Sequence, residues 1–245
     1  MKSFYLSIHL LLLVLTGCNT ATTPEKEPGT IAALNIPNDT SGIDTAAKPA
    51  ILSKEFTGRY VPNNDGNIFI GCDHNTYIIV DESNAIQSDY DKIQQNLSYK
   101  GESAAIKVLG YLKKHSKTGE RDSLMVTKTL EVKPKSFQTE CFNFEFIAIG
   151  NEPFWSVEII PDENLISLKD VSTDKTYKFA YAKPISSGNT FIYDVNNGKN
   201  ETLKVSIRKE ACNDGMSDRN YQYSSSIVIN GKPLSGCAIK KGDNL

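Results

Sequence analysis

Residues 124–132 read Leu-Met-Val-Thr-Lys-Thr-Leu-Glu-Val, and this stretch decides the predicted fold class. One set of alternate positions is apolar, namely Leu124, Val126, Leu130 and Val132. Met125, Thr127, Thr129 and Glu131 occupy the opposite face. Because side chains alternate across a β-strand, this period of two predicts a half-buried antiparallel strand.

The same period recurs along most of the chain. It predicts strands at 56–61, 68–72, 76–80 and 104–112, and it continues in the aromatic runs 142–146, 177–181 and 221–229. These runs are rich in β-branched and aromatic residues, which fit a pleated, half-buried surface. The chain is therefore predicted to be mainly β.

One segment between predicted strands has a helical period instead. Its apolar residues, three or four apart, are Ile86, Tyr90, Ile93 and Leu97. This spacing predicts an amphipathic helix, for which Ser83 is the expected N-cap. Three strands, a helix and two strands match a small OB-type barrel of five strands.

The chain divides into regions of different composition. We expect an OB-like β-barrel domain at 53–135 and an all-β domain at 141–241, the latter an antiparallel sandwich or barrel. Residues 18–52 are polar and lack an apolar period, which predicts a flexible tether. The lysine-rich loop at 113–121 is interpreted as a solvated turn rather than an oligonucleotide-binding loop.

The first 17 residues have the layout of a secretory signal peptide: Lys2, a short apolar core, then small residues. A membrane span needs about 20 apolar residues, so this core is too short to be one. The run Leu15-Thr16-Gly17-Cys18 resembles the lipobox of bacterial lipoproteins. The resemblance implies acyl chains on Cys18 and, because Asn19 rather than aspartate follows, an outer-membrane location facing the periplasm. The alternative is a secreted protein with an incidental cysteine.

Charge and cysteine content narrow the function classes. The 245 residues include 27 Lys plus Arg and 29 Asp plus Glu, a balance that argues against a dedicated nucleic-acid binder. Four cysteines remain besides Cys18, and an even number in an oxidising compartment predicts two disulfides with three possible pairings. We favour Cys212–Cys237 and consider Cys72–Cys141. If the second does not form, Cys72 is a free thiol beside His74.

Few residues suggest chemistry. Cys72 and His74 are the one place where a metal is considered, but the paired ligands of a convincing site are missing, so no metal or cofactor is expected. Asp214, Ser217 and Asp218 superficially resemble a calcium loop without its regular spacing, so we expect a capped turn. Met216 is expected to fill the core.

No nucleophile motif accompanies the histidines of the mature chain, so we expect a non-enzymatic protein. Trp155 is the candidate for a ligand pocket. The competing interpretation, which we favour, is that Pro153-Phe154-Trp155 simply begins a strand that contributes to the core.

Two sets of motifs resemble known envelope proteins. The first set comprises Phe56-Thr57-Gly58-Arg59-Tyr60, Phe69-Ile70-Gly71-Cys72, Tyr77-Ile78-Ile79-Val80, Tyr90, Gly101-Glu102, Val108-Leu109-Gly110-Tyr111 and Leu130-Glu131-Val132. It is similar to the OB-fold domain of NlpE-type lipoproteins, which are linked to copper resistance and envelope stress. The Cys-x-x-Cys domain of that family is absent from this sequence.

The second set comprises Gly150-Asn151-Glu152-Pro153-Phe154-Trp155, Cys212-Asn213-Asp214-Gly215-Met216-Ser217-Asp218 and Gly236-Cys237. It resembles a β-rich domain of uncharacterised envelope lipoproteins. The leading hypothesis is a membrane-anchored protein that binds or senses something in the periplasm. The alternatives are an inhibitor or interaction module for an envelope protein such as a cell-wall hydrolase, and copper handling through Cys72 and His74.

Overall fold

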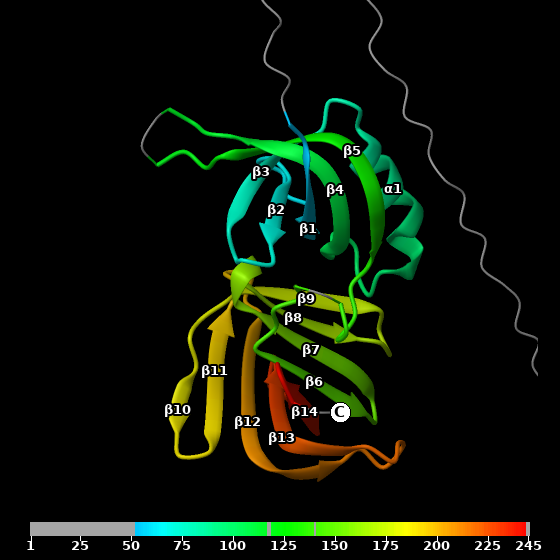
Figure 1. Cartoon of the computed structure of the whole chain (residues 1–245). Coiled ribbons are helices and arrows are strands. Elements are labelled where there is room, and N and C mark those ends of the chain that lie inside the picture. The colour runs from blue at the N-terminus through cyan, green and yellow to red at the C-terminus, as the bar shows by residue number, and fades with distance from the viewer. Residues whose placement is uncertain (1–51, 117–118, 140, 244–245) are drawn as a thin grey trace, which may run out of the picture. The chain divides into compact units, whose positions relative to one another are not determined.

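The computed structural model describes residues 52–116, 119–139 and 141–243. They form a closed barrel of five strands and an antiparallel sheet of nine strands, which confirms the mainly-β prediction (Figure 1). The predicted signal peptide, Cys18 and the predicted tether up to residue 51 lie outside the described residues. Among the described helices, none is long and apolar enough to cross a membrane.

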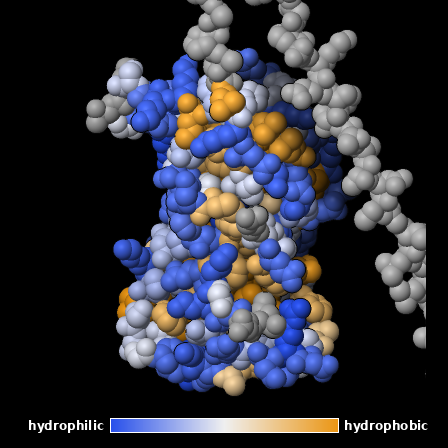
Figure 2. All heavy atoms as spheres, in the orientation of Figure 1, coloured by the Kyte–Doolittle hydropathy of each residue, from blue (hydrophilic) through white to orange (hydrophobic). Residues whose placement is uncertain are grey.

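The barrel strands are β1 (Lys54–Val61), β2 (Ile68–Gly71), β3 (Thr76–Val80), β4 (Ala104–Lys113) and β5 (Ser123–Pro134). They close in the order β1-β2-β3-β5-β4, and only the β3–β5 pairing is parallel. This arrangement is compatible with an OB-like fold. The β4–β5 loop projects from the barrel (Figure 1), and its described surface is hydrophilic, as expected for a solvated turn (Figure 2).

The predicted helix lies between β3 and β4. It consists of α1 (Ala85–Ile93) and a following 3-10 turn, η1 (Gln94–Asn96), and it packs beside β5 (Figure 1). Ile86 and Tyr90 are buried in the barrel core, which confirms the apolar stripe. The N-cap prediction was wrong: Asn84 occupies the N-cap position and makes no side-chain capping bond, while Asp81 accepts the Ile86 N–H at 2.9 Å and the Ser83 hydroxyl oxygen accepts the Ala85 N–H at 3.3 Å.

The prediction that Leu130 faces the core was also wrong. Leu124 is fully buried, whereas Leu130 is 41% exposed. The pairing of β4 with β5 shifts register twice, between Lys107 and Val108 and between Leu109 and Gly110. An extra residue in one strand changes which face the following side chains occupy, so a strict period of two fails beyond the first shift.

The larger sheet contains all the strands after residue 145. They are β6 (Phe146–Asn151), β7 (Phe154–Ile160), β8 (Leu165–Asp170), β9 (Lys175–Ala180), β10 (Ile185–Ser187), β11 (Thr190–Asn196), β12 (Thr202–Asn213), β13 (Asn220–Ile229) and β14 (Lys232–Lys240). A short 3-10 turn, η2 (Pro161–Glu163), joins β7 to β8. The spatial order β10-β11-β12-β13-β14-β6-β7-β8-β9 makes one curled antiparallel sheet of nine strands.

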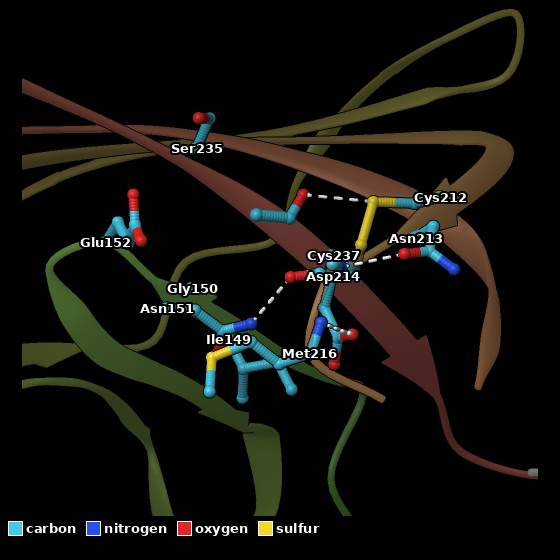
Figure 3. A pocket seen from close by; sticks show the side chains of 12 residues that line it. Ile149, Gly150, Asn151, Glu152, Cys212, Asn213, Asp214, Met216, Ser235 and Cys237 are labelled. Atoms are coloured by element: carbon cyan, nitrogen blue, oxygen red, sulfur yellow. Dashed lines mark hydrogen bonds between the residues drawn. A yellow bond between two sulfur atoms is a disulfide. The ribbon is translucent and has the colours of Figure 1, made fainter. Parts of the chain in front are cut away.

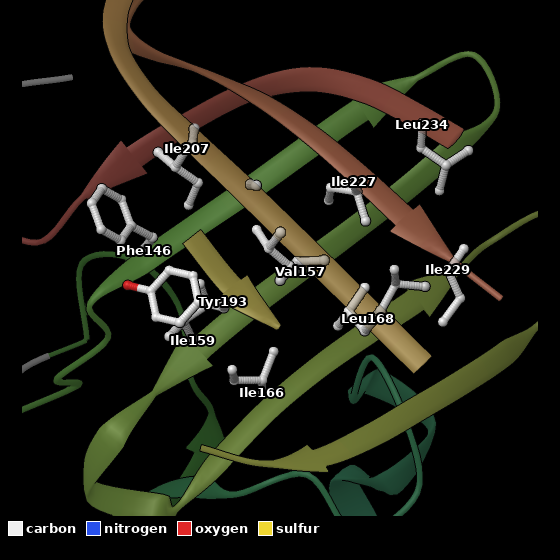
Figure 4. Packing of buried hydrophobic residues seen from close by; sticks show 14 of the residues in the cluster. Phe146, Val157, Ile159, Ile166, Leu168, Tyr193, Ile207, Ile227, Ile229 and Leu234 are labelled. Carbon is white, nitrogen blue, oxygen red and sulfur yellow. The ribbon is translucent and has the colours of Figure 1, made fainter. Parts of the chain in front are cut away.

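The concave side of this sheet is filled by a large apolar cluster (Figure 4). Side chains from β7, β8, β12 and β13 meet there, and Val157, Leu168 and Ile207 are fully buried. Burying apolar surface at about 25 cal/mol per Å² is the main stabilising contribution to such a fold. A second, smaller cluster around Phe142, Ile147 and Ile239 surrounds the Cys212–Cys237 disulfide.

Barrel and sheet belong to one compact unit, Pro49–Leu245, and they meet through buried charges. We call the six residues Arg59, Glu102, Lys135, Glu158, Asp162 and Glu163 the charged junction. The Arg59 side chain is 0% exposed and lies 3.1 Å from Glu163 Oε1. Lys135, 1% exposed, lies 2.9 Å from Glu158 Oε2 and also contacts Glu102. The division at 53–135 and 141–241 into separate domains stays a prediction.

Candidate functional site: a cavity beside the Cys212–Cys237 disulfide

An open cavity of about 650 Å³ lies beside the Cys212–Cys237 disulfide (Figure 3). Three segments line it: 149–152 at the β6–β7 turn, 212–216 at the end of β12, and 235–237 in β14. These segments are far apart in sequence, but each overlaps one of the three motifs 150–155, 212–218 and 236–237. We call it the disulfide cavity.

Two glycines let the strands approach closely at the floor of the cavity. A Cβ atom on Gly236 would lie 2.0 Å from the Ile149 carbonyl oxygen, which is well inside contact distance. A Cβ atom on Gly150 would lie 2.2 Å from Trp155 Nε1. Any larger side chain at either position would push β6 and β14 apart or displace the indole.

Asp214 organises the loop that forms one wall. Its Oδ1 accepts the backbone N–H groups of Ser217 at 2.9 Å and Met216 at 3.0 Å, and its Oδ2 accepts the Tyr221 hydroxyl at 3.0 Å. The hydrogen bonds from Ser217 and Met216 lower the pKa of Asp214 to about 2. The carboxylate is thus used inside the loop, which is a capped turn as the sequence predicts.

The loop is also tied to the opposite wall. Asn151 Nδ2 donates a hydrogen bond to the Asp214 carbonyl oxygen at 2.7 Å, drawn as a dashed line in Figure 3. The Cys212–Cys237 bridge joins β12 to β14 at the same place, with a Cα–Cα distance of 5.6 Å. Two crosslinks, one covalent and one polar, therefore fix the three walls relative to one another.

Three lining side chains remain available to a ligand. Glu152 is exposed, and within the described part of the chain no ion pair or hydrogen bond is found for its carboxylate. Met216 is 68% exposed, and Ser235 presents a hydroxyl. The lining residues include the carboxylates Glu152 and Asp214 but neither histidine nor lysine.

The position of Met216 corrects the sequence interpretation. It was expected to fill the core, yet the capped turn carries it outward at the mouth of the cavity (Figure 3). Trp155, the candidate pocket residue, is 3% exposed and belongs to the core cluster. Its indole lies behind Gly150 and is not among the residues that line the cavity.

The remaining cysteines form the second pairing considered from the sequence. Cys72 follows β2, and it is bonded to Cys141, which precedes β6. A disulfide sulfur is not the thiolate that binds metals. His74 Nδ1 lies 2.9 Å from Asp162 Oδ2, and nowhere in the described ranges do three His, Cys, Asp or Glu side chains gather as metal ligands. The free Cys72 thiol that copper handling beside His74 would need is therefore absent.

Sequence reasoning missed both the cavity residue Glu152 and the charged junction. Burial raises the pKa of Glu158, and Lys135 only partly offsets it. Burial opposes ionisation of Asp162 as well, but hydrogen bonds from His74 and Asn143 lower its pKa. Arg59 lies in the motif Phe56–Tyr60, but alternation along β1 places its side chain on the outer face of the barrel. The sequence gives no sign that residues of the nine-stranded sheet region cover this face.

No protein-family model, curated protein or solved structure matches this chain.

Proposed function

We propose that the chain is a non-enzymatic cell-envelope lipoprotein that binds a ligand or partner in the disulfide cavity. The observation that carries the proposal is the convergence of three distant motifs on one cavity of about 650 Å³. A volume of this size is typical of ligand pockets. Both disulfides suit an oxidising compartment, and the lipobox-like sequence ending at Cys18 supports a lipid anchor facing the periplasm.

The finer assignment rests on the sequence. The barrel is compatible with an OB-like fold, and its motifs resemble the NlpE type, which supports a role in sensing the state of the envelope. In this proposal the barrel and the polar segment before it present the cavity to the periplasm. Acyl chains on Cys18 would hold the protein at the outer membrane, because several chains bind far more firmly than one.

The test is site-specific photocrosslinking of the full chain in intact envelopes. A photoreactive phenylalanine analogue replaces Met216 at the cavity mouth or, as the matched control, Ile185 on β10, which is 69% exposed. We expect an adduct from position 216 that is absent from position 185 and weakened by Glu152→Gln. Identical adducts from both positions, or none from 216, would contradict the proposal.

A second candidate, an interaction module for another envelope protein, is favoured by the apolar surface next to the cavity. Ile149 lines both the disulfide cavity and a small neighbouring hollow that also includes Ile147, Tyr221 and Phe137. Phe137 is 44% exposed. A protein partner would give adducts of protein mass from probes at both 137 and 216, whereas a small ligand would leave position 137 without an adduct.

A further inference from the structure

A second cleft, separate from the disulfide cavity, contains three lysines. It measures about 570 Å³ and lies between residues 94–100, which follow α1, and the β8–β9 hairpin. Lys100 comes from the first segment, and Lys169 and Lys178 come from the hairpin. Asp174 is the single carboxylate among the lining residues. We call this the lysine cleft.

The hairpin register places two of these cations together. Lys169 pairs with Thr176 across the β8–β9 ladder, and Lys178 pairs with Ser167. Because side chains alternate along each strand, Lys169 and Lys178 lie on the same face as diagonal neighbours. Like charges so placed repel, and a bound anion would relieve the repulsion.

The carboxylate in the cleft neutralises these charges poorly. Lys169, 15% exposed, pairs with Asp174, but Asp174 itself is 93% exposed in the hairpin turn. Lys178 has no carboxylate within ion-pair distance in the described ranges of the chain. Its Nζ donates to the Lys100 carbonyl oxygen at 3.2 Å and lies 4.6 Å from the Tyr99 ring centre.

The surroundings of Lys178 only partly compensate its charge, because Glu102 and Glu163 act on it through space without reaching ion-pair distance. The side chain as a whole is exposed, yet desolvation of its ammonium group lowers its pKa. Hydroxyl groups of Ser98 and Thr176 also line the cleft and supply further hydrogen-bond donors. Clustered ammonium groups with neighbouring hydroxyls are well suited to an oxyanion, for which lysine acts as a point charge.

We propose that the lysine cleft binds a phosphate-bearing ligand through Lys178, Lys169 and Lys100. The proposal is independent of the disulfide cavity, so either site can fail without the other. Soluble phosphate monoesters and the phosphodiester of a lipid headgroup share this chemistry. They differ in charge and substitution, so the choice of probe distinguishes the two sources.

The test is calorimetric titration of the full chain with inorganic phosphate at constant ionic strength. We expect saturable binding that Lys178→Met weakens about tenfold, since a charged hydrogen bond is lost. Asp174→Asn should tighten binding, because it removes the carboxylate that competes for Lys169; asparagine also tolerates the left-handed φ of 55° at this position. Lys204→Met, which removes an exposed strand lysine elsewhere, is the matched control.

Repeating the titration with glycerol phosphate and with glycerophosphoglycerol assigns the source. Tighter binding of the monoester indicates a soluble ligand, and tighter binding of the diester indicates a lipid headgroup. The proposal is overturned if phosphate does not saturate the protein, or if Lys178→Met and Lys204→Met lower the affinity equally.

Discussion

The interior of the nine-stranded sheet is filled with aliphatic and aromatic side chains, whereas the junction between sheet and barrel buries charges. Val157, Leu168 and Ile207 are fully buried in the sheet core. Arg59 is equally buried in the junction, but its neighbours are the carboxylates of Asp162 and Glu163. Both regions exclude water, and they achieve this with opposite chemistry.

The difference has a physical consequence. Apolar packing is non-directional and depends little on pH, whereas a buried ion pair must offset the desolvation of both partners. A buried pair is therefore a modest source of net stability, but removing one partner leaves a charge without compensation. We expect the junction to be the more fragile region towards single substitutions and towards pH.

The largest effect is expected from Arg59→Met. The change leaves the buried Glu163 without its cation and Asp162 with only its contacts to His74 and Asn143, and breaking a buried pair in this way costs about 3–5 kcal/mol. Urea unfolding of the two proteins measures it. The matched control is Arg208→Met, because Arg208 is 58% exposed and its pair with Glu210 spans 3.6 Å. That control should change stability by less than about 0.5 kcal/mol.

A second substitution separates lost charge from lost packing. Adding Glu163→Gln to Arg59→Met removes one of the uncompensated carboxylates and should restore part of the stability. If the double variant is no more stable than the single one, the guanidinium acts through packing against Phe142 rather than through its charge.

In the sheet core, Leu168→Ala should lower the unfolding free energy by about 3 kcal/mol, through lost apolar contact and a residual cavity. Because no titratable group takes part in this apolar contact, the loss should be the same at pH 5 and pH 8. Val171→Ala is the control, because Val171 is 56% exposed in the turn after β8. A pH-dependent Leu168 effect would weaken the contrast between the two regions.

The same contrast explains how much the sequence could predict. Alternation and helical spacing identified the barrel strands, α1 and the strand-rich second half, because these elements bury one face each. Leu130 was misplaced because register shifts in the β4–β5 pairing are not visible as composition. Arg59 was missed because its outward face is covered by residues more than 80 positions away in sequence, such as Cys141, whose carbonyl it contacts.

The candidate site was predictable in part. Cys212 and Cys237 were assigned to one disulfide from their positions, and the capped turn at Asp214 followed from its residue types. Met216 was placed inside because methionine is apolar, but the turn is tight and short and leaves its third residue in solvent. That the segments 149–152, 212–216 and 235–237 enclose a cavity depends on how β6 and β14 pair, which a single sequence does not reveal.

The smallest effects are expected from pH, and they should have opposite signs in the junction and at the cavity. Glu158 in the junction has a raised pKa, so the native state holds its proton more tightly than the unfolded chain does. The unfolding free energy should therefore fall as pH rises from about 4.3 through the native pKa, and Glu158→Gln should flatten this decline. Asp214 beside the cavity has its pKa lowered to about 2, so its contribution is complete above about 4 and is lost on acidification.

Asp214→Asn is thus the matched counterpart. It should lower the unfolding free energy at pH 5 and 7.5, with a loss that shrinks towards pH 3, and so it flattens the acid limb of the profile, where Glu158→Gln leaves the slope unchanged. Urea unfolding at pH 3, 5 and 7.5 separates the two contributions. If both variants change the same limb of the pH profile, the assignment of raised and lowered pKa values to the two regions is wrong. If Glu158→Gln changes only the limb above about pH 4.3 and Asp214→Asn only the acid limb, the two regions respond in opposite ways. Deprotonation of Glu158 then destabilises the junction, and protonation of Asp214 destabilises the cavity wall. The joint contribution of these two groups is then largest between their two pKa values, because only there are Glu158 neutral and Asp214 ionised together.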